Sequence, residues 1–123
     1  MLNFQNITPV LPANDVKAEI KFFEQLGFVN VYDSLRYSNK LDYAVLARDQ
    51  QAIHIQFQFE EDMPSKNAAQ QIKIWVADLD ALQTEFEEKG LEIKRRDNTP
   101  WGTNEFGFYS PAHNAIIFVQ DLH

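Results

Sequence analysis

Apolar residues recur at helical spacing in two stretches of the chain. In the first stretch the apolar stripe consists of Val16, Ile20, Phe23 and Leu26, and this spacing predicts a helix. Asn14 or Asp15 can accept hydrogen bonds from the first free N–H groups, and Gly27 suits the left-handed residue that ends a helix. The pattern returns 63 residues later, where the matching residues are Asp78, Leu79, Phe86 and Gly90. An offset of half the chain predicts two copies of one supersecondary unit.

Shorter runs of alternating apolar residues predict strands around both helices. The expected strands are 4–11, 28–32, 43–47 and 52–59 in the first half, and 70–76, 91–95, 105–109 and 115–120 in the second. Each half therefore has the order β-α-β-β-β. We expect a single domain over residues 1–123, with one unit at 1–60, a linker at 61–69 and a second unit at 70–123.

The alternation also assigns faces to the strands. In residues 53–59 the odd positions are all apolar and the even ones, His54, Gln56 and Gln58, are polar. The odd side is expected to pack under the helices, and the even side to face water or a polar-lined cavity. By the same reasoning Gln71 and Trp75 lie on that second face. An exposed Trp marks either ligand contact or a subunit interface.

Composition and charge narrow the class of protein. Apolar residues make up 45% and charged residues 24% of the chain, as in ordinary folded domains. The absence of cysteine excludes disulfides, thiolate metal sites and a cysteine nucleophile. No apolar run is long enough to span a membrane, and the first residues do not resemble a secretory signal, so we expect a cytoplasmic protein.

The acidic balance bears on possible partners. Eleven basic and 18 acidic residues give a net charge of −7, and no basic cluster exceeds Lys94–Arg96, which argues against nucleic-acid binding. The negative charge fits either a cationic ligand or simple solubility. Sixteen aromatic residues, ten of them Phe, leave some available to line a binding site.

Several motifs carry a family resemblance. They are residues 8–16, the Phe-Phe-Glu-Gln-Leu-Gly-Phe of 22–28, the Trp-Val-Ala-Asp-Leu-Asp of 75–80, Pro100-Trp101-Gly102 and the Ser-Pro-Ala-His-Asn of 110–114. The chain resembles the glyoxalase, bleomycin-resistance and extradiol dioxygenase (vicinal oxygen chelate) superfamily, and most closely its bleomycin-resistance proteins. The resemblance implies an α+β fold in which two β-α-β-β-β repeats form an eight-stranded curved mixed sheet with the helices on the outer face.

The resemblance also allows a test for metal chemistry. Enzymes of the superfamily hold a divalent cation with one side chain from the first and one from the fourth strand of each unit, and the matching positions are Thr8, Gln56, Gln71 and Ile117. Threonine is a poor ligand here and isoleucine has no donor atom. We therefore expect no metal, no cofactor and no catalytic residue. A metal-dependent lyase, dioxygenase or thiol transferase with a differently placed site is the alternative, and an interaction module is a third possibility.

Binding without chemistry is the function that the resemblance favours. Resistance proteins of this type are acidic homodimers that sequester a cationic, aromatic antibiotic of the bleomycin family in clefts at the subunit interface. In this comparison Trp101 and Tyr43 correspond to the residues that stack on the drug. The family has Phe at the position of Tyr43, and we expect Tyr to serve as well because stacking needs only the ring. The full set of predicted ligand-contacting residues is Trp101, Tyr43, Trp75, Gln56, His54, Gln71 and Phe106.

Overall fold

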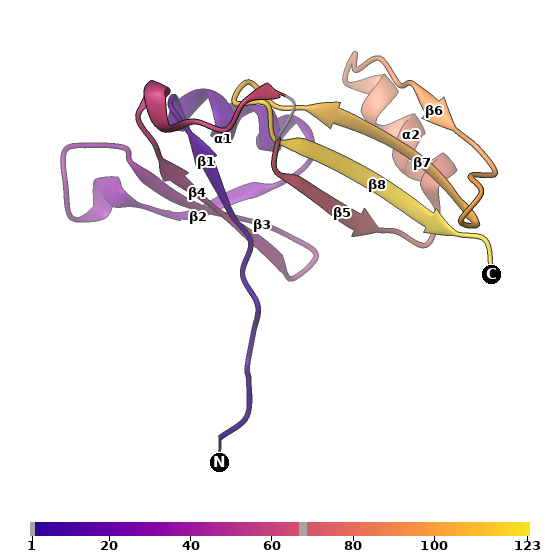
Figure 1. The fold of residues 1–123 in the computed structure, drawn as a ribbon, viewed down its shortest axis with the longest axis horizontal. Helices are drawn as coiled ribbons and strands as arrows, with labels where there is room; N and C mark the ends of the chain where they lie inside the picture. Colours follow the sequence, from indigo (N-terminus) through magenta and orange to yellow (C-terminus); the bar gives the residue numbers. More distant parts are fainter. Residues whose placement is uncertain (1, 67–68) are drawn as a thin grey trace. The chain divides into compact units, whose positions relative to one another are not determined.

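The computed structural model describes residues 2–66 and 69–123 (Figure 1). The chain divides into two compact units, Met1–Met63 and Pro64–His123. The predicted linker at 61–69 includes residues 67 and 68, which lie outside the described residues, so its extent stays a prediction. None of the helices in the described part is both long and apolar enough to cross a membrane.

Unit 1 is a four-stranded sheet with one long helix. Its elements are β1 (Val10–Ala13), α1 (Val16–Gln25), β2 (Val29–Asp33), β3 (Tyr43–Arg48) and β4 (Gln51–Phe57), with short 3-10 turns at Ser34–Arg36 and Glu60–Asp62. The sheet has the order β1-β4-β3-β2, in which β1 runs parallel to β4 and the other neighbours are antiparallel. Figure 1 shows these elements in indigo to magenta.

Unit 2 repeats this topology. Its elements are β5 (Gln71–Trp75), α2 (Leu79–Glu88), β6 (Arg95–Arg96), β7 (Thr103–Tyr109) and β8 (Ala115–Asp121). The order is β5-β8-β7-β6, again with the first strand parallel to the last. The predicted α+β fold of two β-α-β-β-β units is confirmed, and its eight strands form two hydrogen-bonded sheets of four.

The two helices begin and end in the same way. The Asp15 and Asp78 carboxylates accept hydrogen bonds from the backbone N–H three residues further on, at 3.1 and 3.0 Å. Gly27 and Gly90 follow the helix ends with the same φ of 84°, a left-handed conformation that glycine adopts without steric cost. The predicted caps of the repeat are therefore confirmed at both ends.

Two predicted strands are shorter in the structure. The first covers Val10–Ala13 instead of residues 4–11, and its register with β4 starts at the pair Val10 and His54. The segment before it leaves the sheet (Figure 1), and the side chains of Leu2 and Phe4 are fully exposed. The predicted strand 91–95 is reduced to β6, because only Arg95 and Arg96 have partners on β7.

The helix-facing sides of the two sheets hold the cores. In unit 1 Ile53 and Ile55 are buried, as their alternation predicts. In unit 2 the core is an aromatic cluster of Phe86, Phe106, Phe108 and Phe118, whose ring centroids lie 5.2 to 6.4 Å apart. Most of these pairs meet edge to face, the geometry that aromatic rings favour.

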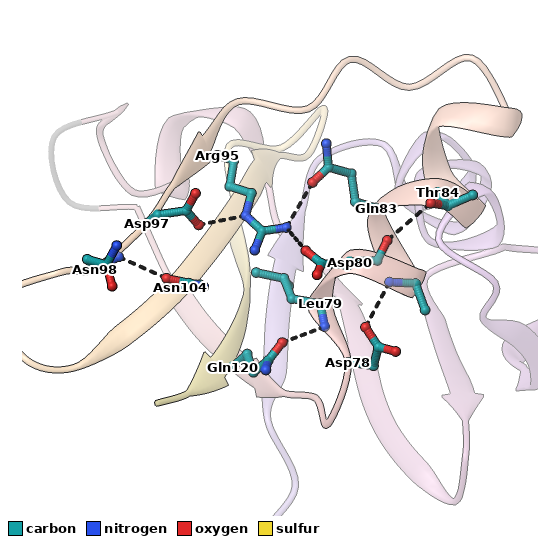
Figure 2. Close-up of polar contacts among 11 residues, drawn as sticks. Asp78, Leu79, Asp80, Gln83, Thr84, Arg95, Asp97, Asn98, Asn104 and Gln120 are labelled. Atoms are coloured by element: carbon teal, nitrogen blue, oxygen red, sulfur yellow. Dashed lines mark hydrogen bonds and ion pairs between the residues drawn. The ribbon is translucent and has the colours of Figure 1, made fainter. Parts of the chain in front are cut away.

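A polar network attaches the short strand β6 to α2 (Figure 2). The Arg95 guanidinium donates to Asp97 at 2.7 Å, to Asp80 at 2.5 Å and to Gln83 at 3.0 Å. The hydrogen bond to Asp97, with the further carboxylate of Asp80, raises the pKa of Arg95 above its ordinary value. At the start of α2, Leu79 N donates to the Gln120 side chain on β8 at 2.8 Å (Figure 2). These bonds attach the first turns of α2 to β6 and β8.

Candidate functional site

The face of the unit 2 sheet away from α2, here called the unit 2 open face, carries the predicted tryptophans. On β5, Gln71 and Trp75 point to this face, and Trp75 is 60% exposed. The register places Trp75 beside Val119, Val119 beside Glu105 and Glu105 beside Arg96. One row of side chains therefore crosses the whole open face, from one edge strand to the other.

Trp101 lies in the turn between β6 and β7 and is 50% exposed. The turn is held by two buried hydroxyl groups, since Thr99 Oγ1 lies 2.7 Å from Thr103 Oγ1 and also accepts from Thr103 N at 3.0 Å. Gly102 N donates to Thr99 O at 2.9 Å, and Gly102 has a φ of 85°. This left-handed residue directly after Trp101 explains the glycine of the Pro-Trp-Gly motif. The indole is thus presented by a fixed turn.

Charged residues surround the Trp101 indole. Its Nε1 donates to Glu105 Oε2 at 3.4 Å, and the same oxygen accepts from Thr103 Oγ1 at 2.9 Å. The Lys73 ammonium lies 5.8 Å and the Arg96 guanidinium 4.8 Å from the ring centroid, both over the ring. Because Lys73 belongs to β5 and Arg96 to β6, the two edge strands, the indole lies over the sheet between its edges. We call this group, Trp101 with Lys73, Arg96 and Glu105, the Trp101 subsite.

The unit 1 sheet also has a face away from its helix, and it carries three predicted residues. Tyr43 pairs with Gln56 across β3 and β4, and His54 pairs with Val45, so Tyr43, His54 and Gln56 share this face. The Tyr43 hydroxyl lies 2.6 Å from His54 Nδ1, and the two rings meet edge to face at 5.4 Å. Both side chains are half-buried while Gln56 is exposed. The hydroxyl therefore orients the imidazole and leaves Nε2 as its other polar position.

Phe106 does not belong to either face. Its side chain is 2% exposed and its ring packs against Phe86 and Phe118 in the core. The reason is the alternation of β7, where Glu105 and Gly107 point to the open face and Phe106 to the helix side. The prediction that Phe106 contacts a ligand is wrong.

Sequence reasoning missed Lys73 and Arg96 as neighbours of Trp101. Lys73 was visible on the polar side of β5, between Gln71 and Trp75. Arg96 stands in the basic triplet, but its position beside Trp101 depends on the β6–β7 register, which the sequence pattern does not contain.

The positions that hold metal in the superfamily can be compared with the register. Val10 pairs with His54 in unit 1 and Lys73 pairs with Ile117 in unit 2, and both pairs are related by the 63-residue repeat. His54, and not Gln56, is therefore the counterpart of Ile117. An isoleucine side chain has no donor, and residues 2–66 and 69–123 contain no group of three His, Asp or Glu side chains arranged to hold a metal ion. The donor set does not fit the superfamily's metal site.

Comparisons with known proteins agree with this architecture. The family model described as Glyoxalase/Bleomycin resistance protein/Dioxygenase superfamily matches residues 6–118. A bleomycin-binding protein solved in complex with bleomycin is similar over 96% of this chain and 99% of its own, with a TM-score of 0.76 and 17% identity. The bleomycin-binding protein of Streptomyces verticillus, solved with copper(II)-bleomycin, has a TM-score of 0.70 and 26% identity over 96% of this chain and 97% of its own.

A glyoxalase/bleomycin resistance protein from Catenulispora acidiphila is similar over 94% of this chain and 96% of its own, with a TM-score of 0.70 and 19% identity. No curated protein sequence matches the chain. The family model covers most of the sequence, and the solved structures share the paired β-α-β-β-β fold described above. The chain belongs to the glyoxalase/bleomycin resistance protein/dioxygenase superfamily.

Proposed function

We propose that the protein is a cytoplasmic binding protein that sequesters a flat aromatic small molecule with cationic groups, such as a bleomycin-family antibiotic, without changing it chemically. In this proposal the protein is a homodimer, and the ligand binds in a cleft at the subunit interface. It is supported by membership of the superfamily and by the similarity to bleomycin-binding proteins solved with bleomycin.

The observation that carries the proposal is the half-exposed Trp101 on its fixed turn. An aromatic side chain that is held in place loses little conformational freedom when a ring stacks on it, so more of the contact energy remains for binding. Trp75 lies on the same open face and offers a second flat surface.

Three residues of the unit 1 face are proposed as further ligand contacts. Tyr43 offers a ring, and His54 and Gln56 offer hydrogen-bonding groups beside it. Gln71 offers a further amide on the unit 2 open face. A few polar groups next to aromatic surface are typical of small-molecule sites.

The proposed homodimer is supported by exposed apolar side chains on the faces of the two sheets that lie away from the helices. Trp75 and Tyr109 are well exposed on unit 2, and Val10 and Val29 on unit 1. Apolar surface of this kind is commonly covered by a second subunit. The net charge of −7 adds a long-range attraction for cationic ligands that added salt should weaken.

Calorimetric titration of the intact chain with metal-free bleomycin tests the proposal. We expect binding at tens of micromolar or tighter. Trp101→Ala should weaken it by about 5- to 150-fold, which corresponds to the roughly 1–3 kcal/mol of one stacking contact. Leu35→Ala, which removes an exposed apolar side chain of the 3-10 turn Ser34–Arg36 that is not among the proposed ligand contacts, is the control and should leave affinity unchanged. The absence of heat and of any Trp spectral change with the intact chain would refute the resistance function, and a monomer in sedimentation would refute the interface cleft.

A further inference from the structure

The Trp101 subsite contains two cations, and neither forms an ion pair with a carboxylate in the part of the chain that the structure describes. Lys73 and Arg96 are both exposed. Among the residues that the structure describes, the ion pairs of unit 2 involve Arg95, Lys89 and His123, and neither Lys73 nor Arg96 takes part in one. The contrast with the neighbouring Arg95 is direct, because Arg95 has two carboxylate partners and Arg96 instead lies over an indole ring.

The one carboxylate at the subsite is held by neutral donors. Glu105 accepts from the Thr103 hydroxyl at 2.9 Å and from the Trp101 indole N–H at 3.4 Å. It is the register partner of Arg96, yet the two side chains form no ion pair. Glu105 therefore lies at the N–H edge of the indole, while Lys73 and Arg96 each lie over the ring.

This arrangement decides which charge a ligand can carry beside Trp101. A cationic group that approached the ring would meet Lys73 and Arg96 where it sought the negative face of the indole. An acidic group beside a stacked ring would lie near both cations and could accept hydrogen bonds from the guanidinium and the ammonium. These are short-range effects, whereas the net charge of the whole protein is screened over about 8–10 Å at physiological salt.

We propose that the Trp101 subsite selects a flat aromatic ring that carries an acidic substituent, with Lys73 and Arg96 binding the anion and Trp101 the ring. The inference rests on the proposed function, because it requires that an aromatic small molecule stacks on Trp101. It adds the chemical class of the part that lies there, a carboxylate-, sulfonate- or phosphate-bearing ring. Any cationic part of the same ligand then lies away from Trp101.

Three matched probes test the charge preference: 2-naphthalenesulfonate, 2-naphthylmethylammonium and the neutral 2-naphthalenemethanol. Titrations followed by the indole N–H signals in NMR separate Trp101 from Trp75, and Trp101→Phe assigns the signal. We expect the sulfonate to bind at least about fivefold more tightly than the ammonium, as two exposed cation contacts would give.

The double variant Lys73→Gln/Arg96→Gln should remove this preference, lowering affinity for the sulfonate and raising it for the ammonium. Lys94→Gln removes one positive charge, half of what the double variant removes, from an exposed position outside the cation contacts of the Trp101 ring, and should change each affinity less than about twofold. Neutral-probe affinity serves as the reference for stacking and should be similar in all variants.

The outcomes separate the two proposals. A neutral probe that shifts the Trp101 signal, together with equal affinities for sulfonate and ammonium or a preference unchanged in the double variant, would overturn the charge selection and leave aromatic binding in place. If none of the three probes shifts the Trp101 signal at millimolar concentration, stacking on Trp101 fails and the charge selection fails with it.

Discussion

The two units of the chain share a backbone plan and differ on the faces that look away from their helices. Both helices begin after a capping aspartate and end before a glycine with φ of 84°. The unit 1 face has a tyrosine bonded to a histidine, whereas the unit 2 face has a tryptophan with two cations over its ring. The repeated residues are those that cap and pack the helices, so the faces are free to carry different chemistry.

The largest change in the free energy of unfolding should come from substitutions in the two cores. Phe23 and Phe86 are equivalent in the repeat and both fully buried, but Phe86 meets three other Phe rings and Phe23 meets two. Phe86→Ala should lower the free energy of unfolding by about 3–5 kcal/mol, with Phe23→Ala at or below that value. Urea denaturation measures both, and the exposed Phe59→Ala is the control. A smaller loss for Phe86→Ala than for Phe23→Ala would contradict the comparison.

The equivalent glycines should respond unequally. Gly27→Ala and Gly90→Ala both place a side chain at positive φ, which costs about 1–2 kcal/mol. A Cβ at Gly27 would also lie 2.5 Å from Arg48 Nη1, which donates to Leu26 O at 2.8 Å, whereas a Cβ at Gly90 meets nothing within 4 Å. Gly27→Ala should therefore cost about 0.5–1.5 kcal/mol more, the net value of one hydrogen bond. Equal midpoints in thermal unfolding would show that Arg48 moves without cost.

Tyr43→Phe tests whether the hydroxyl has a role beside the ring. Stacking alone predicts a silent substitution, but the 2.6 Å contact with His54 Nδ1 predicts a loss of about 0.5–1.5 kcal/mol in the free energy of unfolding. The ¹⁵N shifts of the imidazole should change as the Nδ1 partner is lost. Tyr109→Phe is the matched control, because Tyr109 lies 5.8 Å from His113 as a ring contact only. Equal changes in stability for Tyr43→Phe and Tyr109→Phe would show that the Tyr43 hydroxyl adds nothing beyond a ring contact.

The smallest expected effect is a shift in the pKa of Asp121, near the end of unit 2. The backbone N–H and the ring of His123 both bond to Asp121, and these hydrogen bonds lower the pKa of the Asp121 carboxyl. Because the pKa of Asp121 is lower in the folded chain than in the unfolded one, its ionised carboxylate stabilises the fold at pH values above about 3.9, the pKa of an unfolded Asp. This stabilisation is lost as the pH falls through the folded pKa. An NMR titration should show Asp121 titrating below that value, and His123→Ala should move its pKa only part of the way back, since the backbone bond remains.

Much of the fold could be predicted from sequence because its signals are local. The caps at Asp15 and Asp78 and the alternation in 53–59 depend on neighbouring residues alone. The bounds of the short strands β1 and β6 could not be predicted, because they depend on pairing with another strand, and the local alternation of residues does not contain that pairing. For the same reason the Tyr43–His54 bond and the cations beside Trp101 became visible only once the register was known.

Phe106 shows how a local signal can also mislead. It stands next to Glu105 on an aromatic-rich strand, and only the direction of the neighbouring side chains reveals that it belongs to the core. A motif match does not say which face of a strand a residue occupies. Trp101 was predicted from the resemblance of Pro100-Trp101-Gly102 to the family motif, and the structure explains the glycine of that motif by its φ of 85°.

The parallel pairing of first and last strands has a consequence for how the chain acquires its structure. Val10 pairs with His54 and Gln71 pairs with Ala115, so the partners are 44 residues apart in the sequence of each unit. Contacts so distant in sequence close slowly, because the intervening loop must lose its freedom before they form. During synthesis from the N-terminus, unit 1 cannot complete its sheet until β4 has left the ribosome, and unit 2 cannot do so until β8 has left it. Each half is thus finished only by its own final strand.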